Sequence, residues 1–175
     1  MKLLIVVDMQ NDFVDGSLGS EEAQAIVPNV VNKVQEYIDN GYEVIFTKDT
    51  HYEDYDNTLE GKLLPVPHCK YNTKGWDIID SLAKFIQYDN VYKIHKETFA
   101  FLDWNHFVDL TNYTEIELVG LCTDICVVSN ALIIRGNVPN TVIKVDASCC
   151  AGVTPEKHKA ALEVMKSCQI EVINE

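Results

Sequence analysis

The sequence of 175 residues predicts a three-layer α/β/α sandwich with a six-stranded, mainly parallel sheet of the Rossmann type. Six apolar runs of strand length alternate with helical patterns, which is typical of strands joined by right-handed crossovers. Runs such as residues 3–7 are continuously apolar, as expected for central strands that helices cover on both faces. The predicted strands span residues 2–7, 42–48, 90–95, 115–120, 141–146 and 169–173.

The first long helix is expected over residues 21–39, between the first two strands. Gly41 follows at the position where glycine commonly ends a helix, and it therefore predicts the C-terminal cap. The apolar residues at helical spacing on one face of this helix are Val27, Val30, Val31, Val34 and Ile38.

Two further helices follow the fourth and fifth strands. The first is expected over residues 124–135 and ends at Gly136. The second spans residues 155–167, with Thr154 as its N-cap and Pro155 at the first helical position. Its buried stripe is formed by Ala161, Leu162 and Met165.

Charge and composition exclude several classes of partner. The formal charge of −13 argues against binding to nucleic acid or to anionic membranes, because both require clustered Lys and Arg. The apolar run at residues 3–7 is too short for a secretion signal or a membrane span. Because no linker, repeat or change of composition divides the chain, residues 1–175 are expected to form a single domain.

The six cysteines are expected to be free thiols. No pair of them forms a Cys-x-x-Cys motif, so a thioredoxin-type redox pair is not predicted. Most should pack as small buried hydrophobic side chains. Free thiols in an unsignalled chain indicate a reducing compartment, and a cytoplasmic location is expected.

Polar residues follow four of the predicted strands directly: Asp8, Asp49 with His51, Lys96, and Cys126. The carboxyl ends of parallel strands share one edge of a sheet, and ligands bind in the crevice at that edge. These side chains are therefore expected to converge on one pocket. An acid, a cation and a thiol in one pocket indicate nucleophilic hydrolysis.

Cys126 is the predicted nucleophile. With Thr123 as N-cap, Cys126 lies in the first turn of a helix, where free N–H groups and the helix dipole favour a thiolate and can bind an oxyanion. Asp8 is placed to act as the base, and Lys96 to stabilise the ionised pair. Each residue also has a structural alternative: a buried inert thiol, a strand-end cap and a solvated lysine.

A metal site is predicted near the second strand. Asp49 and His51 are two residues apart, so an extended chain presents them on one face, and Glu60 and His68 follow in the long loop. Carboxylate and imidazole ligands together suit Zn²⁺, Mn²⁺ or Fe²⁺. From spacing alone, a chance arrangement of surface residues is an equal alternative. The competing carboxylates in the loop are Glu53, Asp54 and Asp56.

Three segments resemble one known family. They are residues 7–13, residues 123–127 around the predicted thiol, and residues 150–156. The chain is similar along nearly its whole length to the isochorismatase-like cysteine hydrolase superfamily, and within it to the metal-containing nicotinamidases. The family's Thr-Asp-x-Cys-Val segment selects Cys126 over the other five cysteines. Its lysine, with an aromatic residue three positions on, corresponds to Lys96.

The resemblance implies roles for these residues. Asp8, Lys96 and Cys126 would form the catalytic set. The family carries a non-proline cis peptide before the helix, and this corresponds to Leu121–Cys122. Such a bond would direct the Cys122 N–H toward the oxyanion, beside the N–H of Cys126.

The resemblance also implies one divalent metal ion, with zinc as the expected metal and manganese or iron as alternatives. Asp49, His51, Glu60 and His68 match the family's ligand positions, although several relatives have His where this chain has Glu60. In such enzymes the metal keeps open positions that hold a substrate lone pair, such as that of a pyridine nitrogen.

Substrate contacts are expected from the segment after the first strand. Phe13 would form one wall for the substrate ring, and Gln10 in the same segment is a second candidate contact. The opposite wall is not identified by the sequence. Its aromatic candidates are Trp76, Phe99, Phe101 and Trp104.

The expected reaction is hydrolysis of nicotinamide to nicotinate and ammonia, through a thioester on Cys126 with Asp8 as general base and acid. A related hydrolase acting on another amide or an N-carbamoyl compound is an alternative. A catalytically silent binding domain is another, and a hydrolase using metal-bound water is a third. The expected partner is a small amide, and the resemblance suggests a homo-oligomer because relatives are often oligomeric.

Overall fold

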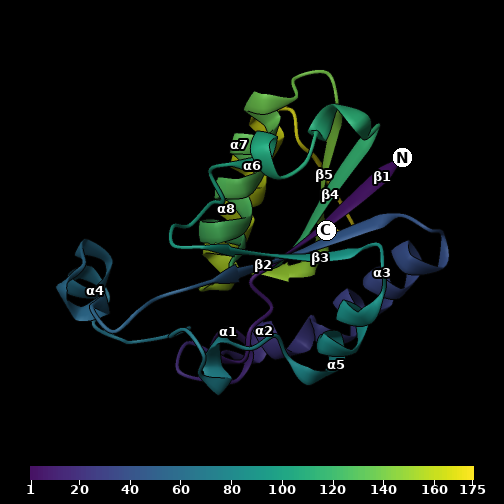
Figure 1. Cartoon of the computed structure of the whole chain (residues 1–175). Coiled ribbons are helices and arrows are strands. Elements are labelled where there is room, and N and C mark those ends of the chain that lie inside the picture. Colours follow the sequence, from purple (N-terminus) through teal and green to yellow (C-terminus); the bar gives the residue numbers. More distant parts are fainter.

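The computed structural model describes residues 1–175 and contains one six-stranded sheet in the order β3-β2-β1-β4-β5-β6 (Figure 1). Every pair of neighbouring strands is parallel, so the predicted α/β class is confirmed and the sheet is parallel throughout. The order is that of the Rossmann fold. The strands are β1 (Lys2–Val7), β2 (Glu43–Asp49), β3 (Val91–Lys96), β4 (Glu115–Leu121), β5 (Val142–Ala151) and β6 (Glu171–Ile173).

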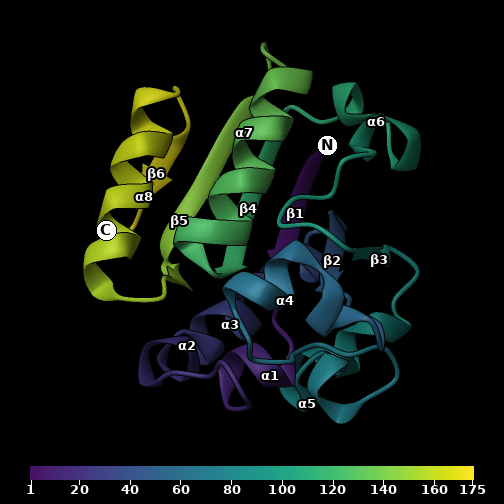
Figure 2. The ribbon, with the colours of Figure 1, turned by 90° about the vertical axis from the view of Figure 1, so that its left-hand side faces the viewer.

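Helices cover both faces of the sheet (Figures 1 and 2). The α-helices are α1 (Asn11–Val14), α2 (Glu21–Ala25), α3 (Val27–Asp39), α4 (Leu59–Leu63), α5 (Asp80–Ala83), α6 (Trp104–Phe107), α7 (Val128–Asn137) and α8 (Pro155–Ser167). The helices α1, α2, α3 and α5 lie on one side, α7 and α8 on the other, and α4 stands apart from both layers. No helix combines the length and apolar character needed to cross a bilayer.

Two hydrophobic cores lie on opposite faces of the sheet. Side chains alternate along a strand, so Leu4 and Val6 of β1 face the core beneath α3, whereas Leu3, Ile5 and Val7 face the core beneath α7 and α8. All five side chains are fully buried. The continuously apolar strand thus supplies both cores at once, as the sequence pattern predicts.

The predicted helix over residues 21–39 is in fact two helices. Ser20 caps α2 by accepting a hydrogen bond from the N–H of Ala23, and α3 begins at Val27. Pro28 lies in the first turn of α3 and has no N–H to donate back to α2, so the hydrogen-bond ladder starts again there. The cap of α8 is as predicted: Thr154 accepts a hydrogen bond from the N–H of Lys157.

The strand order reverses between β1 and β4: β2 and β3 are added on one side of β1, and β4, β5 and β6 on the other side. In such sheets the crevice for a ligand opens at the carboxyl ends of these two strands. Gly120 lets β4 approach β1 closely at this point. Its φ is +115°, and a Cβ there would lie 2.1 Å from the Val7 carbonyl oxygen, one residue before Asp8.

Substitution of Gly120 by alanine is therefore expected to destabilise the protein by about 3 kcal/mol or more, because the added methyl group meets backbone and the left-handed conformation is strained. Urea unfolding measures this. The control is Gly136→Ala in α7, where nothing lies within 4 Å of the added Cβ, and no loss of stability is expected there. Equal stabilities of the two variants would contradict this account of Gly120.

Candidate active site

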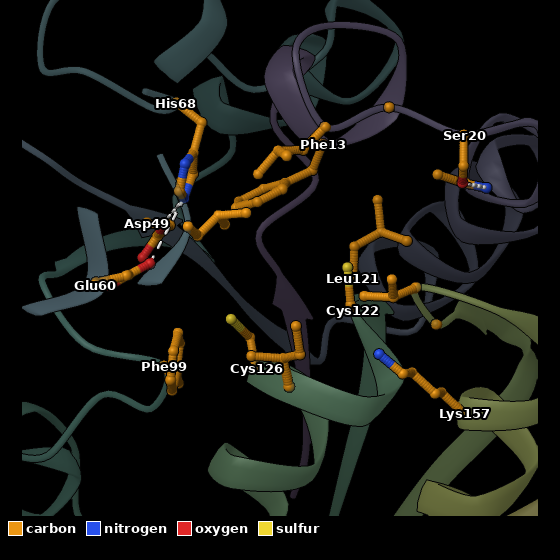
Figure 3. A pocket seen from close by; sticks show the side chains of 17 residues that line it. Phe13, Ser20, Asp49, Glu60, His68, Phe99, Leu121, Cys122, Cys126 and Lys157 are labelled. Atoms are coloured by element: carbon orange, nitrogen blue, oxygen red, sulfur yellow. Dashed lines mark hydrogen bonds and ion pairs between the residues drawn. The ribbon is translucent and has the colours of Figure 1, made fainter. Parts of the chain in front are cut away.

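A cavity of about 520 Å³ opens at the carboxyl edge of the sheet (Figure 3). Asp49 at the end of β2 lines one part of it, and Cys122 and Cys126 after β4 line the centre. Gly152 and Lys157, which follow β5, line the other part. Most of the remaining lining is apolar. A cavity of this size falls in the range of small-molecule binding sites.

Asp8, Lys96 and Cys126 meet in a buried cluster beside this cavity. Lys96 Nζ lies 2.7 Å from Asp8 Oδ2 and donates to Cys126 Sγ at 3.6 Å. It also lies 3.2 Å from Asp49 Oδ1. All four residues are at most 5 % exposed. The structure thus brings together an acid, a cation and a thiol from three separate strand ends.

Thr47 holds the Asp8 carboxylate in place, and the sequence reasoning missed this residue. Its hydroxyl donates to Asp8 Oδ1 at 2.6 Å and accepts from the Asp8 N–H at 3.2 Å. Asp8 itself has a left-handed backbone with φ of 48°, a conformation that Asp tolerates better than most residues. Thr47 lies two positions before Asp49 on β2. Because side chains alternate along a strand, Thr47 and Asp49 lie on the same face of β2, and this spacing could have identified Thr47 as a site residue.

Burial sets the protonation chemistry of this cluster. It raises the pKa of the Asp8 carboxyl above its usual value, although the charge of Lys96 opposes this. Burial, together with the charge of Asp8, raises the pKa of the Cys126 thiol well above its usual value. In the resting site, burial therefore favours the protonated thiol over the thiolate that the sequence predicts.

Lys96 keeps its positive charge despite being buried. Burial alone would lower the pKa of its ammonium, but the charges of Asp8 and Asp49 outweigh this and raise the pKa above its usual value. Its ammonium also donates to the carbonyl oxygen of Thr98 at 3.2 Å. The side chain is thus fixed as a cation at the centre of the cluster.

The nucleophile segment begins with a cis peptide bond between Leu121 and Cys122, as the family resemblance implies. A π-helical turn over Thr123–Val127 follows and carries Cys126. Thr123 does not cap this turn, contrary to the prediction. Its hydroxyl instead lies 2.8 Å from His158 Nδ1 on α8, because the turn begins one residue earlier, with Cys122 as N-cap.

Asn130 ties this turn to the loop after β3, and no sequence signal pointed to it. Its side chain is fully buried and donates to the carbonyl oxygen of Cys126 at 2.8 Å. Its Oδ1 accepts from the N–H of Phe101 at 3.0 Å and from Trp104 Nε1 at 3.2 Å. One amide side chain therefore fixes the backbone of the nucleophile relative to the loop that carries Phe99.

Asp49, His51 and His68 form a cluster of metal-ligand type, with donor atoms within 4.8 Å of one another. His51 Nε2 lies 2.9 Å from Asp49 Oδ2, and His68 Nε2 lies 3.5 Å from the same oxygen. Glu60 Oε1 lies 3.7 Å from both Nε2 atoms. The donor set and its convergence fit a divalent metal such as zinc.

The surroundings of the histidines orient them toward this point. His68 Nδ1 lies 2.8 Å from the carbonyl oxygen of Val66, and a hydrogen bond there leaves Nε2 as the lone-pair donor. Tyr55 packs edge-on against both imidazoles, with ring centroids 4.8 Å from His51 and 5.3 Å from His68. Glu60 comes from α4, the helix that stands apart from the two layers.

The sequence predicts that Gln10 contacts the substrate, but in the structure Gln10 does not line the cavity. Its side-chain amide donates to the carbonyl oxygens of Asp49 and Trp76 and accepts from the N–H of Asp49, so it fixes the backbone of a candidate ligand. Phe13 does line the cavity, and of the four aromatic candidates for the opposite wall only Phe99 does so (Figure 3). The side chains of Trp76 and Trp104 are buried.

Comparison with known proteins agrees with this architecture. A nicotinamidase/pyrazinamidase of Mycobacterium tuberculosis is 30% identical over 99% of this chain and 98% of its own length. The crystal structure of a pyrazinamidase/nicotinamidase from Streptococcus mutans is 31% identical, with a TM-score of 0.88 over 99% of this chain and 100% of that one. A zinc-bound pyrazinamidase from Pyrococcus horikoshii shares the fold, with 24% identity, a TM-score of 0.81 and 99% of each chain covered. The isochorismatase domain model matches residues 2–175, and the chain belongs to the isochorismatase family.

Proposed function

We propose that this protein hydrolyses nicotinamide to nicotinate and ammonia, with residues 1–175 acting as one hydrolase domain. The observation that carries the proposal is the buried contact of Lys96 with both Asp8 and Cys126, at a cavity that also contains the Asp49–His51–His68 cluster. The similarity to proteins named as nicotinamidases over 98% or more of both lengths supports this choice among amides.

In the first half-reaction, the Asp8 carboxylate removes the Cys126 proton as the sulfur attacks the amide carbon. The N–H groups of Cys122 and Cys126 donate to the developing oxyanion. When the C–N bond breaks, Asp8 gives the proton to the nitrogen, ammonia leaves, and a thioester stays on Cys126. Lys96 stays charged and balances the negative charge that moves between carboxylate and sulfur.

In the second half-reaction, Asp8 removes a proton from water as the water oxygen attacks the thioester carbon. The C–S bond breaks, nicotinate is released, and the proton returns to the sulfur. The raised pKa of Asp8 suits both steps, because a stronger base accepts the proton more readily and still gives it up to the departing amine.

Asp49, His51, His68 and Glu60 would hold one divalent metal ion, and zinc is the metal their donor set suits best. When bound, this metal supplies a Lewis acid that accepts the lone pair of the pyridine nitrogen. Phe13 and Phe99 would flank the ring, since both line the cavity beside the metal cluster. Together they would orient the carboxamide toward Cys126.

We further propose a cytoplasmic location. All six cysteines are free thiols, and four of them are buried in the structure. Free thiols persist in a reducing compartment.

Substitution of Cys126 by alanine is expected to lower ammonia release from nicotinamide at least about a thousandfold, because the covalent route is lost. Cys149→Ala is the matched control, since Cys149 is buried in the core beneath α3 and does not line the cavity. Retention of activity in the Cys126 variant, with loss of activity on chelation, would instead identify a hydrolase that uses metal-bound water.

Substitution of His68 by alanine is expected to lower the bound zinc, measured by atomic spectroscopy after dialysis, at least about tenfold. The loss follows because His68 supplies one of the two imidazole donors, and its removal leaves only Asp49, His51 and Glu60 to hold the metal. His106→Ala is the control, because His106 is exposed and remote from the cluster. Unchanged zinc content in the His68 variant would show that this cluster is not the metal site.

A further inference from the structure

The cavity is longer than nicotinamide requires. Its lining residues follow β2, β4 and β5 along the carboxyl edge of the sheet. From β2 to β5 there are three strand spacings, which amount to about 14 Å. A pyridine ring with one carboxamide, placed between the metal cluster and Cys126, leaves the part beyond Cys122 unfilled. That part, called here the α8 end, is lined by Ser20, Ala23, Gly152, Val153 and Lys157.

The two ends of the cavity are lined by different charged side chains. Asp49 and Glu60 line the metal end, whereas Lys157 extends its ammonium from α8 into the α8 end, toward Cys122 (Figure 3). Lys157 forms no ion pair with a carboxylate, which is also true of several other lysines such as Lys159, so its charge is available to a ligand in the cavity.

The acidic residues near the α8 end form no ion pair with the Lys157 ammonium. Asp124 Oδ1 accepts a hydrogen bond from the N–H of Val153. Glu21, Glu22 and Glu156 are exposed and do not line the cavity. The N-terminus of α8, a helix of 13 residues, adds partial positive charge at the same place. An anionic group would therefore be favoured there.

We propose that the enzyme also hydrolyses N-acyl amino acids in which a nicotinoyl-type acyl group is joined to a small amino acid. This inference rests on the proposed function. The acyl ring occupies the metal end, the amide carbon lies at Cys126, and the amine with its carboxylate extends into the α8 end toward Lys157. Lys157 is thus a specificity-determining residue for the leaving amine.

The chemistry is that of the primary amide with a larger leaving group. The Cys126 sulfur bonds to the amide carbon, the C–N bond breaks, and the proton held by Asp8 passes to the nitrogen of the departing amino acid. Water then cleaves the thioester as before. No oxidant, reductant or second substrate is required.

The test compares two conjugates, N-nicotinoylglycine and its neutral amide N-nicotinoylglycinamide, by release of nicotinate. The wild-type protein is expected to show a kcat/KM about fivefold higher for N-nicotinoylglycine than for its amide. The factor is modest because the ion pair between Lys157 and the substrate carboxylate would be partly exposed to solvent. Lys157→Met should bring the ratio of the two values to about one, and Lys157→Glu should invert it. Lys159→Met is the matched control, because this lysine lies on α8 outside the cavity and its loss should leave the ratio unchanged.

Ammonia release from nicotinamide by each variant tests the proposed function separately. Turnover of nicotinamide without release of nicotinate from either conjugate would overturn the inference and leave the proposed function standing. Equal cleavage of both conjugates by the wild-type protein, or a ratio that Lys157→Met does not change, would also overturn it. Cleavage of neither nicotinamide nor the conjugates would reject the proposed function itself.

Discussion

The buried ion pair between Lys96 and Asp8 is the interaction on which the site depends. The two groups are 2.7 Å apart and almost fully excluded from solvent, and the same ammonium contacts Cys126 and Asp49. Removing one partner of such a pair leaves an uncompensated charge in the interior, which is strongly destabilising. The ion pair therefore joins the candidate nucleophile, its base and a metal-type donor into one unit.

The topology of the sheet explains how this unit forms. Asp8, Asp49 and Lys96 each end or follow a strand, and β3, β2, β1 and β4 are neighbours in that order. The register pairs Asp49 of β2 directly with Lys96 of β3. Gly120 removes the side chain that would separate β4 from β1, so the end of β4, from which the Cys126 segment continues, lies against the residue before Asp8.

Strand positions and the convergence of the strand-end residues could be predicted, because continuous apolar runs and parallel topology determine both. The prediction ended the fifth strand at residue 146, whereas β5 continues to Ala151. The metal-type cluster could be predicted only with the family resemblance, because the Asp49-x-His51 spacing alone leaves a chance arrangement as an equal alternative. The structural role of Gln10 could not, since its three hydrogen bonds reach segments distant in the sequence. The resting state of Cys126 was missed because a pKa depends on burial, which a local helix pattern does not reveal.

The most direct test of the account is the interception of the acyl-enzyme by hydroxylamine during turnover of nicotinamide. If a thioester forms on Cys126 beside Asp8 and Lys96, the product is expected to divide between nicotinate and nicotinohydroxamate, in a ratio that follows the hydroxylamine concentration. Ammonia release that continues at the usual rate with no hydroxamate, at any concentration of hydroxylamine, would contradict the covalent route.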